Sequence, residues 1–283
     1  MDFQFPLVRF STELEHLEEL QKGTMYLRNA CHYRRIESTT GDTVQGDLLD
    51  CKIPYSGAAF EKAFAEAGLT KYLDRGLTKA GVTKEDMVGD LSLMGANTFI
   101  CCMFAFNSGN VMGCDEKYLL LKINEDQDKL RKFGGWALVI CNPERFIQSF
   151  DNAKVDCRRK FHGYVDYRDL QNQAVADKIS DVFITSHFNA NPQNLKAFEL
   201  IKSTAYAFEQ EYRFVVNMEY APEDIRDEYR MEIKTDGKKI DVEDCTAYSF
   251  ICQAEDILTR TLCLKRDRDN FEAGFLRENT INQ

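Results

Sequence analysis

The sequence predicts an α+β fold, in which mixed or antiparallel sheets surround a cleft and carry a helical insertion. Short apolar runs typical of strands alternate with segments in which apolar residues repeat at helical spacing. Residues 57–94 have the most helical pattern, with aromatic and leucine side chains interrupted by glycines. The chain has no internal repeat, low-complexity segment or linker, so residues 1–283 are predicted to form a single domain. The insertion is either a lid over the cleft or a surface for a partner.

The beginning of the chain is predicted to alternate between strand and helix. Residues 5–10 form an apolar strand, and Ser11 or Thr12 caps the helix that follows. A glycine ends this helix, and residues 24–27 are predicted to form the second strand. A short helix is predicted over residues 30–37, after the second strand.

Apolar runs in the middle of the chain indicate buried strands. They cover residues 99–106 and 134–141, and residues 118–123 form another apolar segment between them. The first run contains Cys101 and Cys102, for which the sequence offers no polar partner that would lower the pKa of a thiol. We interpret both cysteines as core residues rather than nucleophiles.

A further strand is predicted at residues 161–167, after a helix that begins at Asn142 and Pro143. His162 lies on this strand. A catalytic histidine would need a nucleophile, and none can be identified beside it. We therefore interpret His162 as a hydrogen-bonded structural residue.

The period of the hydrophobic pattern changes from helical to strand-like within residues 202–216. Asn191 and Pro192 are typical of a helix start, and the helical spacing continues as far as Phe208. Beyond that point, alternate residues face opposite sides of a strand. One side carries Phe208, Tyr212, Phe214 and Val216, and the other carries Glu209, Glu211 and Arg213. The charged side is either the solvent face of an edge strand or a catalytic carboxylate pair held by a cation.

The last fifty residues are predicted to contain a hairpin, a strand and a polar helix. Residues 230–235 and 238–243 flank an Asp-Gly pair that is typical of a two-residue hairpin turn. Residues 246–252 form the final strand. The alternating charges of residues 256–282 indicate a solvated helix.

Composition limits the classes of protein to which the chain can belong. The formal net charge of −10 opposes broad, non-specific binding to nucleic acid, although Arg28 with Arg34 and Arg35 could form a local basic groove. The ten cysteines include no Cys-x-x-Cys pair, and the chain lacks both an 18-residue apolar run and a signal peptide. We therefore predict a cytoplasmic protein with free thiols and no membrane partner.

One pattern of residues resembles that of a known family. The pattern lysine, aromatic residue, Glu-x-Glu, aromatic residue and arginine resembles the signature of an uncharacterised bacterial family found in phage-defence and abortive-infection loci. The matching residues are Lys202, Tyr206, Glu209, Glu211, Tyr212 and Arg213. A Glu-x-Glu pair on a late strand is also similar to the third motif of ADP-ribosyltransferases. The nearest functional likeness is the RNA-modifying toxin of toxin–antitoxin–chaperone modules.

This resemblance implies an enzyme that uses NAD as its cofactor. Glu211 would stabilise the charge that develops on the ribose, and Glu209 would orient or deprotonate the acceptor. Arg9 on the first strand would hold NAD. The remaining residues with implied cofactor roles are Tyr26, Tyr33, Ser38 and Arg213. Three of these also have ordinary interpretations, because tyrosines on strands are often core residues and Ser38 lies in a segment typical of turns.

Two other functions remain open at the level of sequence. The first is a non-catalytic phage-defence protein that senses or binds a partner, and the second is a metal-dependent nuclease that uses Glu209, Glu211 and Asp166. A transferase would need NAD, whereas a nuclease would need a divalent metal. For the transferase, RNA, DNA and protein are all open as acceptors. The toxin resemblance favours RNA and suggests an antitoxin protein as a partner.

Overall fold

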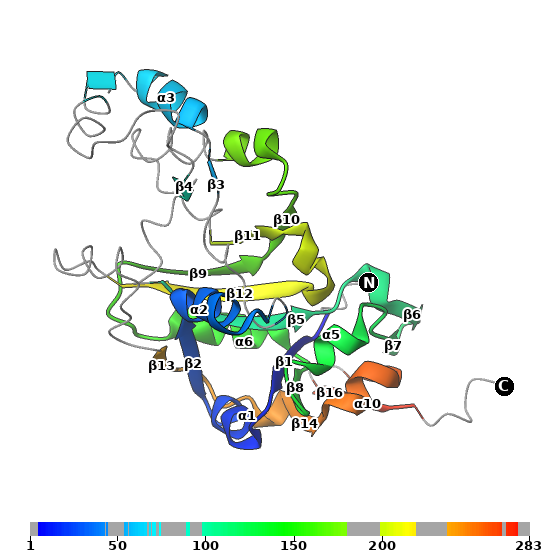
Figure 1. Cartoon of the computed structure of the whole chain (residues 1–283). Helices are drawn as coiled ribbons and strands as arrows, with labels where there is room; N and C mark the ends of the chain where they lie inside the picture. Colours follow the sequence, from blue (N-terminus) through cyan, green and yellow to red (C-terminus); the bar gives the residue numbers. More distant parts are fainter. Residues whose placement is uncertain are drawn as a thin grey trace.

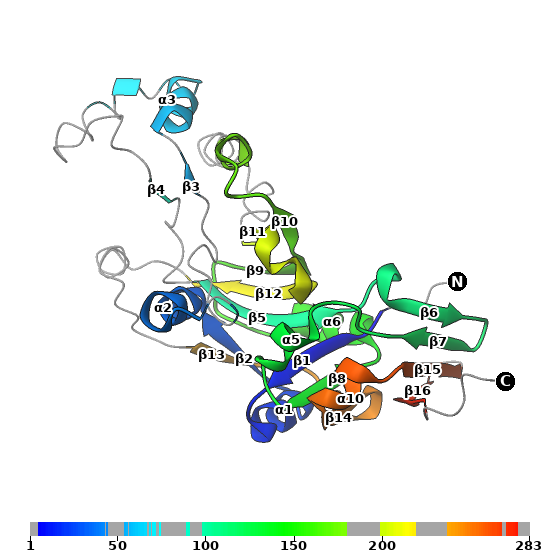
Figure 2. The same cartoon turned by 45° about the vertical axis from the view of Figure 1, so that its right-hand side comes forward.

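The computed structural model describes residues 5–42, 98–179, 199–218, 237–267 and 270–276, together with parts of residues 44–90. Within these residues the fold is α+β, and most of its strand pairs are antiparallel. Figures 1 and 2 show the largest sheet at the centre, with helices and the smaller sheets around it. The predicted fold class is thereby confirmed at this coarse level.

The central sheet has eight strands and branches at β5 (Thr98–Ala105). One edge of β5 pairs along residues 98–104 with β12 (Glu211–Asn217), and β12 pairs in turn with β9 (Arg159–Tyr164). The other edge is shared by two strands, β1 (Leu7–Ser11) and β2 (Thr24–Asn29). All strand pairs of this sheet are antiparallel.

The two strands that share an edge of β5 diverge from each other. On β1, Leu7 and Val8 pair with the carboxyl end of β5, and on β2, Arg28 and Asn29 pair with its amino end. Residues 101–103 have no strand partner on this edge among the residues that the structure describes. We call this interruption the split of the sheet. Helix α1 (Leu14–Gln21) connects the two diverging strands.

Additional strands extend the sheet from each branch. Beyond β1 lie β8 (Trp136–Ile140) and β14 (Ser249–Gln253), and beyond β2 lies β13 (Gly237–Asp241). The prediction of buried strands in this part of the chain is confirmed for β5 and β8, because nearly all of their residues are buried.

Three smaller sheets surround the central one. The four-stranded sheet contains β6 (Val111–Cys114), β7 (Tyr118–Leu121), β15 (Leu262–Asp267) and β16 (Asn270–Phe275). A parallel pair is formed by β10 (Asp166–Arg168) and β11 (Ile201–Ser203), which lies above the β9–β12 side of the sheet in Figure 1. The third consists of β3 (Pro54–Tyr55) and β4 (Gly89–Asp90).

Helices complete the fold. Beyond α1, the α-helices of the described residues include α2 (Ala30–Thr40), α3 (Gly57–Glu66), α5 (Gln127–Arg131), α6 (Pro143–Asn152) and α10 (Ala254–Thr259). Short 3-10 helices are η2 (Ser108–Asn110), η3 (Thr204–Glu209) and η4 (Thr246–Tyr248). Helix α6 begins as predicted, because the side chain of Asn142 accepts a hydrogen bond from the backbone of Arg145 and Pro143 occupies the first turn.

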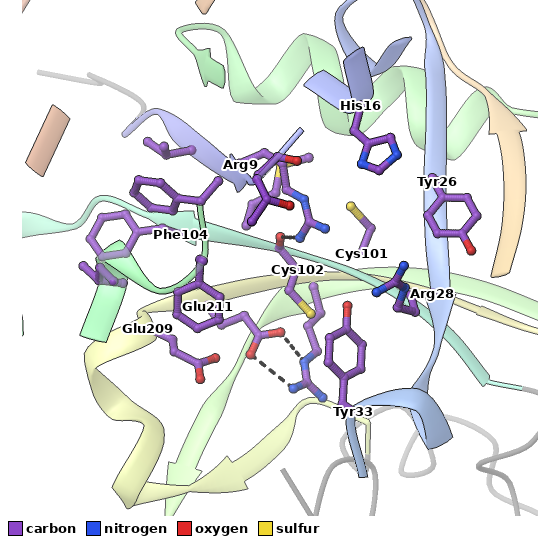
Figure 3. Close-up of a pocket in the computed structure, with 18 of the residues that line it drawn as sticks. Arg9, His16, Tyr26, Arg28, Tyr33, Cys101, Cys102, Phe104, Glu209 and Glu211 are labelled. Atoms are coloured by element: carbon purple, nitrogen blue, oxygen red, sulfur yellow. Dashed lines mark hydrogen bonds and ion pairs between the residues drawn. The ribbon is translucent and has the colours of Figure 1, made fainter. Parts of the chain in front are cut away.

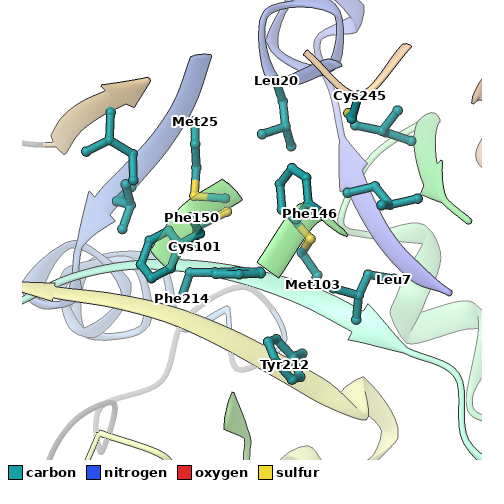
Figure 4. Close-up of a cluster of buried hydrophobic side chains, with 14 of the residues drawn as sticks. Leu7, Leu20, Met25, Cys101, Met103, Phe146, Phe150, Tyr212, Phe214 and Cys245 are labelled. Atoms are coloured by element: carbon teal, nitrogen blue, oxygen red, sulfur yellow. The ribbon is translucent and has the colours of Figure 1, made fainter. Parts of the chain in front are cut away.

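The two larger hydrophobic cores of the described residues lie on opposite faces of the sheet. The first contains the side chains of α1, α6 and β12 that Figure 4 shows, among them Leu20, Phe146, Phe150 and Phe214. The second lies under the four-stranded sheet and α10 and includes Phe106. Burial of each large apolar side chain stabilises the fold by ~1.5–3 kcal/mol. Strand β12 and its neighbours are therefore fixed firmly from the α6 side.

The predicted helix that ends at Phe208 is wrong in the part that the structure describes. Residues 191–198 lie outside the described residues, but β11 is a strand and is followed by η3. The side chain of Ser203 accepts a hydrogen bond from the backbone of Ala205 and thereby starts a new helical turn. Gln210 then adopts a left-handed conformation with φ of 40°, so β12 begins at Glu211 rather than at Phe208.

Two further expectations are corrected. The described residues 262–267 and 270–275 of the tail are not a solvated helix, because β15 and β16 form a hairpin in which Leu262 and Leu264 are buried. Their spacing of two residues is that of a strand, and the charges beside them obscured it. The predicted turn at Ser38 is instead the last part of α2, which ends at Gly41 in a left-handed conformation. Residues 230–235 lie outside the described residues, as does much of the predicted insertion, of which α3 is helical.

Candidate functional site

A cavity of about 280 Å³ lies at the split of the sheet. Its walls come from β1, β2, α1 and the middle of β5, and residues of β11, η3 and β12 close one end (Figure 3). The predicted site residues in its lining are Arg9, Tyr26, Tyr33, Glu209, Glu211 and Arg213. The structure thus brings together residues that are about two hundred positions apart in the sequence.

The split explains why a cavity forms inside a sheet. A continuous strand beside β5 would cover its edge, whereas here the backbone of residues 101–103 faces an open space. Arg9 partly fills that space, because its Nη1 donates a hydrogen bond to the backbone oxygen of Cys102. A side chain thus satisfies a backbone group that would otherwise belong to a ladder of hydrogen bonds.

Glu211 and Arg213 form a buried ion pair at the inner end of the cavity. The Nε of Arg213 lies 2.5 Å from Oε1 of Glu211, and its Nη2 lies 3.1 Å from Oε2. Arg213 also donates to the backbone oxygen of Glu199 at 3.0 Å, and its side chain is 0% exposed. The forked contact fixes the orientation of the Glu211 carboxylate.

Lys202 connects the two carboxylates. Its Nζ lies 2.7 Å from Oε2 of Glu209 and 3.4 Å from Oε2 of Glu211, and it also lies 4.6 Å from the centre of the Tyr206 ring. Strand β11 places Lys202 there through its parallel pairing with β10. We call the group of Lys202, Glu209, Glu211 and Arg213 the charged cluster.

The pKa values of the two carboxyl groups in the charged cluster are shifted in opposite directions. Burial raises the pKa of Glu209 to about 8, and the negative charge of Glu211 adds to this while Lys202 opposes it. Burial alone would also raise the pKa of Glu211, but Arg213 and Lys202 outweigh burial and hold it well below its usual range. At neutral pH, Glu211 is therefore an anion, and Glu209 mostly carries a proton.

The predicted cofactor residues occupy different parts of the cavity. Arg9 and Tyr33 lie near its middle, and Tyr26 lies at the outer end, where its side chain is 38% exposed. Ser38 is the exception. It is exposed near the end of α2 and does not line the cavity. The helix continues through Ser38 instead of turning toward the cavity.

The interpretation of the adjacent cysteines requires a correction. Both line the cavity, and both have polar neighbours that the sequence did not reveal. Burial raises the pKa of the Cys101 thiol, and the nearby Arg9 opposes part of that effect. Cys102 forms a side-chain hydrogen bond with Glu211. The thiols therefore belong to the surroundings of the site, although burial keeps Cys101 protonated.

His162 is hydrogen-bonded, as predicted. It lies on β9 beside Phe214 of β12, on the face of the sheet opposite the charged cluster. Its Nδ1 lies 2.5 Å from the hydroxyl of Tyr212, and its Nε2 lies 3.3 Å from Oδ2 of Asp151. The ring also packs beside Phe150 and Phe214 in the first core. His162 therefore supports the core and takes no part in the cavity.

The chain matches no family model, no curated protein and no solved structure. The site is therefore interpreted from its own geometry and charges. Among the described residues, every helix is too short or too polar to cross a membrane.

The residues proposed for a nuclease are not assembled. Asp166 is exposed on β10 and pairs with Arg168, whose Nη2 lies 2.7 Å from its Oδ2. Glu209 and Glu211 instead line the cavity and pair with cations. The part of the chain that the structure describes contains no group of three His, Cys, Asp or Glu residues arranged to hold a metal ion.

Three cavity residues, Lys202, Arg28 and His16, were not predicted as catalytic or cofactor-binding residues. Lys202 belongs to the quoted pattern, but its bridging position depends on β11, which was expected to be helix. Arg28 follows Tyr26 by two residues on β2, so strand alternation could have placed both on one face. His16 lies on α1, which spans the split. For His16 the sequence offers no signal.

Proposed function

We propose that the chain transfers ADP-ribose from NAD to a macromolecule. The observation that carries the proposal is the convergence of Arg9 from β1 with Glu209 and Glu211 on a single cavity at the split of the sheet. An ionised carboxylate, a second carboxyl group that acts as a base once it has lost its proton, and an arginine are thereby available around one ligand. These are the groups that transfer of a glycosyl unit requires.

The proposed reaction exchanges one bond at the anomeric carbon of the ribose for another. The bond to nicotinamide breaks, and nicotinamide leaves with the electron pair. The positive charge that develops on the ribose is stabilised by the Glu211 carboxylate, whose field is strong because water is excluded from the buried cluster. A nucleophilic atom of the acceptor then forms the new bond, and its proton passes to ionised Glu209.

The pKa of Glu209 suits the role of a general base. A base with a pKa of about 8 binds a proton more strongly than an ordinary glutamate does, and part of it is ionised near neutral pH. The rate should therefore rise as the pH approaches 8. Arg213 and Lys202 keep Glu211 ionised throughout this range.

The size of the cavity indicates how much of NAD it encloses. Sites for drug-sized ligands usually have volumes of ~300–1,000 Å³. The cavity of about 280 Å³ lies just below that range, so it accommodates the nicotinamide ribose portion, and the rest of the cofactor extends toward the outer end. Tyr33 and Tyr26 line this route and offer rings on which a base can stack.

We further propose RNA as the acceptor and the role of a toxin that acts against phage infection. This part of the proposal is supported by the resemblance of the Glu-x-Glu pattern to an RNA-modifying toxin. The net charge of −10 disfavours indiscriminate RNA binding, so the acceptor would be a defined RNA. An antitoxin protein would then be needed to restrain the toxin in the cell.

Labelled NAD provides the direct test. The protein is incubated with NAD carrying a labelled ADP-ribose unit, and with total RNA or total protein in separate reactions. We expect label on RNA with the wild type and a loss of at least about 100-fold with Glu209→Gln, because a general base contributes ~10²–10⁴-fold. Glu18→Gln, which alters an exposed acid outside the cavity, is the matched control and should retain full activity.

Glu209→Gln is preferable to Glu211→Gln as the main variant. It replaces a group that is mostly protonated at neutral pH, so the fold should tolerate it, whereas Glu211→Gln leaves Arg213 buried without its partner. Equal labelling by wild type and Glu209→Gln would contradict the proposal. An unchanged biological effect in both variants would favour a non-catalytic interaction protein instead.

A further inference from the structure

Two arginines line the cavity from opposite walls of the split without a carboxylate partner. Arg9 projects from β1 and Arg28 from β2. Arg9 is hydrogen-bonded to the backbone oxygen of Cys102 and to the hydroxyl of Tyr33. Neither arginine forms an ion pair with an acidic residue among the residues that the structure describes. Both guanidinium groups therefore retain their charge and part of their donor capacity for a ligand.

Arg28 is held in place by two neutral neighbours. Its Nη1 lies 3.0 Å from Nε2 of His32, and its Cζ lies 5.9 Å from the centre of the Tyr26 ring. Because a guanidinium can only donate, the Nε2 of His32 is the acceptor in this contact. His32 thus orients Arg28 without cancelling its charge.

The guanidinium groups of Arg9 and Arg28 both act on the hydroxyl of Tyr33. Burial raises the pKa of the Tyr33 hydroxyl, and the positive charges of both Arg9 and Arg28 oppose that rise. Both charges are therefore within electrostatic reach of the same oxygen. In Figure 3, the Tyr33 side chain points toward the space between Arg9 and Arg28.

The cavity as a whole has an excess of positive charge. Four cationic side chains line it, namely Arg9, Arg28, Lys202 and Arg213, against the two carboxyl groups of Glu209 and Glu211. Lys202 and Arg213 are already paired with those carboxyl groups. Arg9 and Arg28 therefore contribute to a positive excess in the cavity, within a chain whose formal net charge is −10. A positive cavity in an acidic protein attracts an anionic ligand.

We propose that Arg9 and Arg28 form a binding site for an organic diphosphate, with one guanidinium for each phosphate group. Two planar forks on facing walls suit two adjacent phosphates, because each fork can donate two parallel hydrogen bonds. The inference rests on the proposed function for the identity of the natural ligand, NAD, whose diphosphate would occupy this site. The anion site itself requires only the two arginines.

Calorimetric titration of the full chain at low salt tests the site with ADP, AMP and adenosine. We expect ADP to bind more tightly than AMP and AMP more tightly than adenosine, because each added phosphate gains a charged partner. Arg28→Gln should weaken ADP binding about tenfold or more and leave adenosine binding unchanged. Arg168→Gln removes an exposed arginine outside the cavity and should bind ADP as the wild type does.

Arg28→Lys keeps the positive charge but lacks the fork, so it should give an intermediate affinity for ADP. If circular dichroism shows that Arg28→Gln folds poorly, Arg28→Lys still tests the role of the guanidinium group. ADP affinity that is no higher than that of adenosine would overturn the proposal, as would wild-type affinity in both Arg28 variants.

The outcomes also separate this inference from the transfer reaction. Binding of ADP that depends on Arg28, without any transfer from NAD, would contradict the transferase and support the diphosphate site. Transfer from NAD that is unchanged in Arg28→Gln, with unchanged ADP affinity, would overturn the diphosphate site and leave the transferase intact.

Discussion

The two faces of β12 are equally buried but chemically opposite. All seven residues of the strand are buried, and alternate side chains face different surroundings. Tyr212, Phe214 and Val216 pack in the first hydrophobic core, whereas Glu211 and Arg213 face the cavity. The apolar face accounts for stability in a simple way. The attraction within a buried ion pair does little more than offset the cost of removing its charges from water. Stability therefore does not explain why charged residues occupy this face, whereas binding or catalysis does.

The largest effect is expected on the apolar face. Phe214 is fully buried, and its ring lies 4.9 Å from that of Phe150 and 5.6 Å from that of Phe146, in edge-to-face contacts. Phe214→Ala should lower the free energy of unfolding by ~3–5 kcal/mol, because it removes buried apolar surface and leaves a cavity. Urea denaturation followed by circular dichroism measures this. A loss below about 1 kcal/mol would show that the first core does not fix β12.

The charged face should respond differently to single and double changes. Arg213→Met leaves Glu211 buried without its main partner and should cost ~3 kcal/mol of unfolding free energy. Replacing both residues by methionine removes the unpaired charge, so most of that loss should be recovered. The same denaturation experiment compares the variants. If the double variant were as unstable as the single one, the ion pair would itself be a stabilising element.

A separate effect should appear in the dependence of stability on pH. The pKa of Glu209 is about 8 in the folded chain, against ~4.3 for an unperturbed glutamate. The folded chain keeps a proton that the unfolded chain releases. This contribution to stability is therefore complete below about pH 4.3 and is lost as the pH rises through 8.

The urea midpoint of the wild type should accordingly fall between pH 5 and pH 8, and Glu209→Gln should reduce that fall. Other titrating groups are common to both proteins, so the difference between the two curves isolates Glu209. Parallel curves would mean that Glu209 is ionised in the folded state like an ordinary acid.

The smallest expected change concerns Lys202. Its charge lowers the pKa of Glu209, so Lys202→Met should raise that pKa further. In the transfer assay, the rising limb of the pH–rate profile should then move to higher pH, with the maximal rate retained in part. An unshifted profile with a lower rate would indicate that Lys202 only supports the structure.

The sequence predicted several of the residues that line the cavity, but it did not predict the strand pairing that forms the cavity. Strand alternation placed Glu211 and Arg213 on one face, and the resemblance added Arg9 and Tyr33. Lys202 could not be placed, because its position depends on the parallel pairing of β11 with β10, more than thirty residues earlier in the chain. The split was equally hidden, since it follows from the registers of β1 and β2 on β5.

The local spacing of apolar residues also predicted the wrong secondary structure in two segments. Ile201 and Phe208 have helical spacing, yet the first lies on a strand and the second in a 3-10 helix. The buried leucines of β15 have strand spacing, but the charged residues between and after them suggested a helix. In both places, hydrogen bonds to a distant strand outweigh the preference of the local segment.

The hydrogen bond from Arg9 to the backbone of Cys102 has a practical consequence for experiments. Arg9 lines the cavity and also connects β1 to β5 through this hydrogen bond. Truncating its side chain would remove both the charge and the connection between the strands. Reduced ligand affinity in such a variant would therefore have two causes. Arg28 already belongs to a regular ladder through its backbone, and its side chain can be altered without disturbing that ladder. Arg28 is therefore the position from which ligand recognition can be measured separately from the integrity of the sheet.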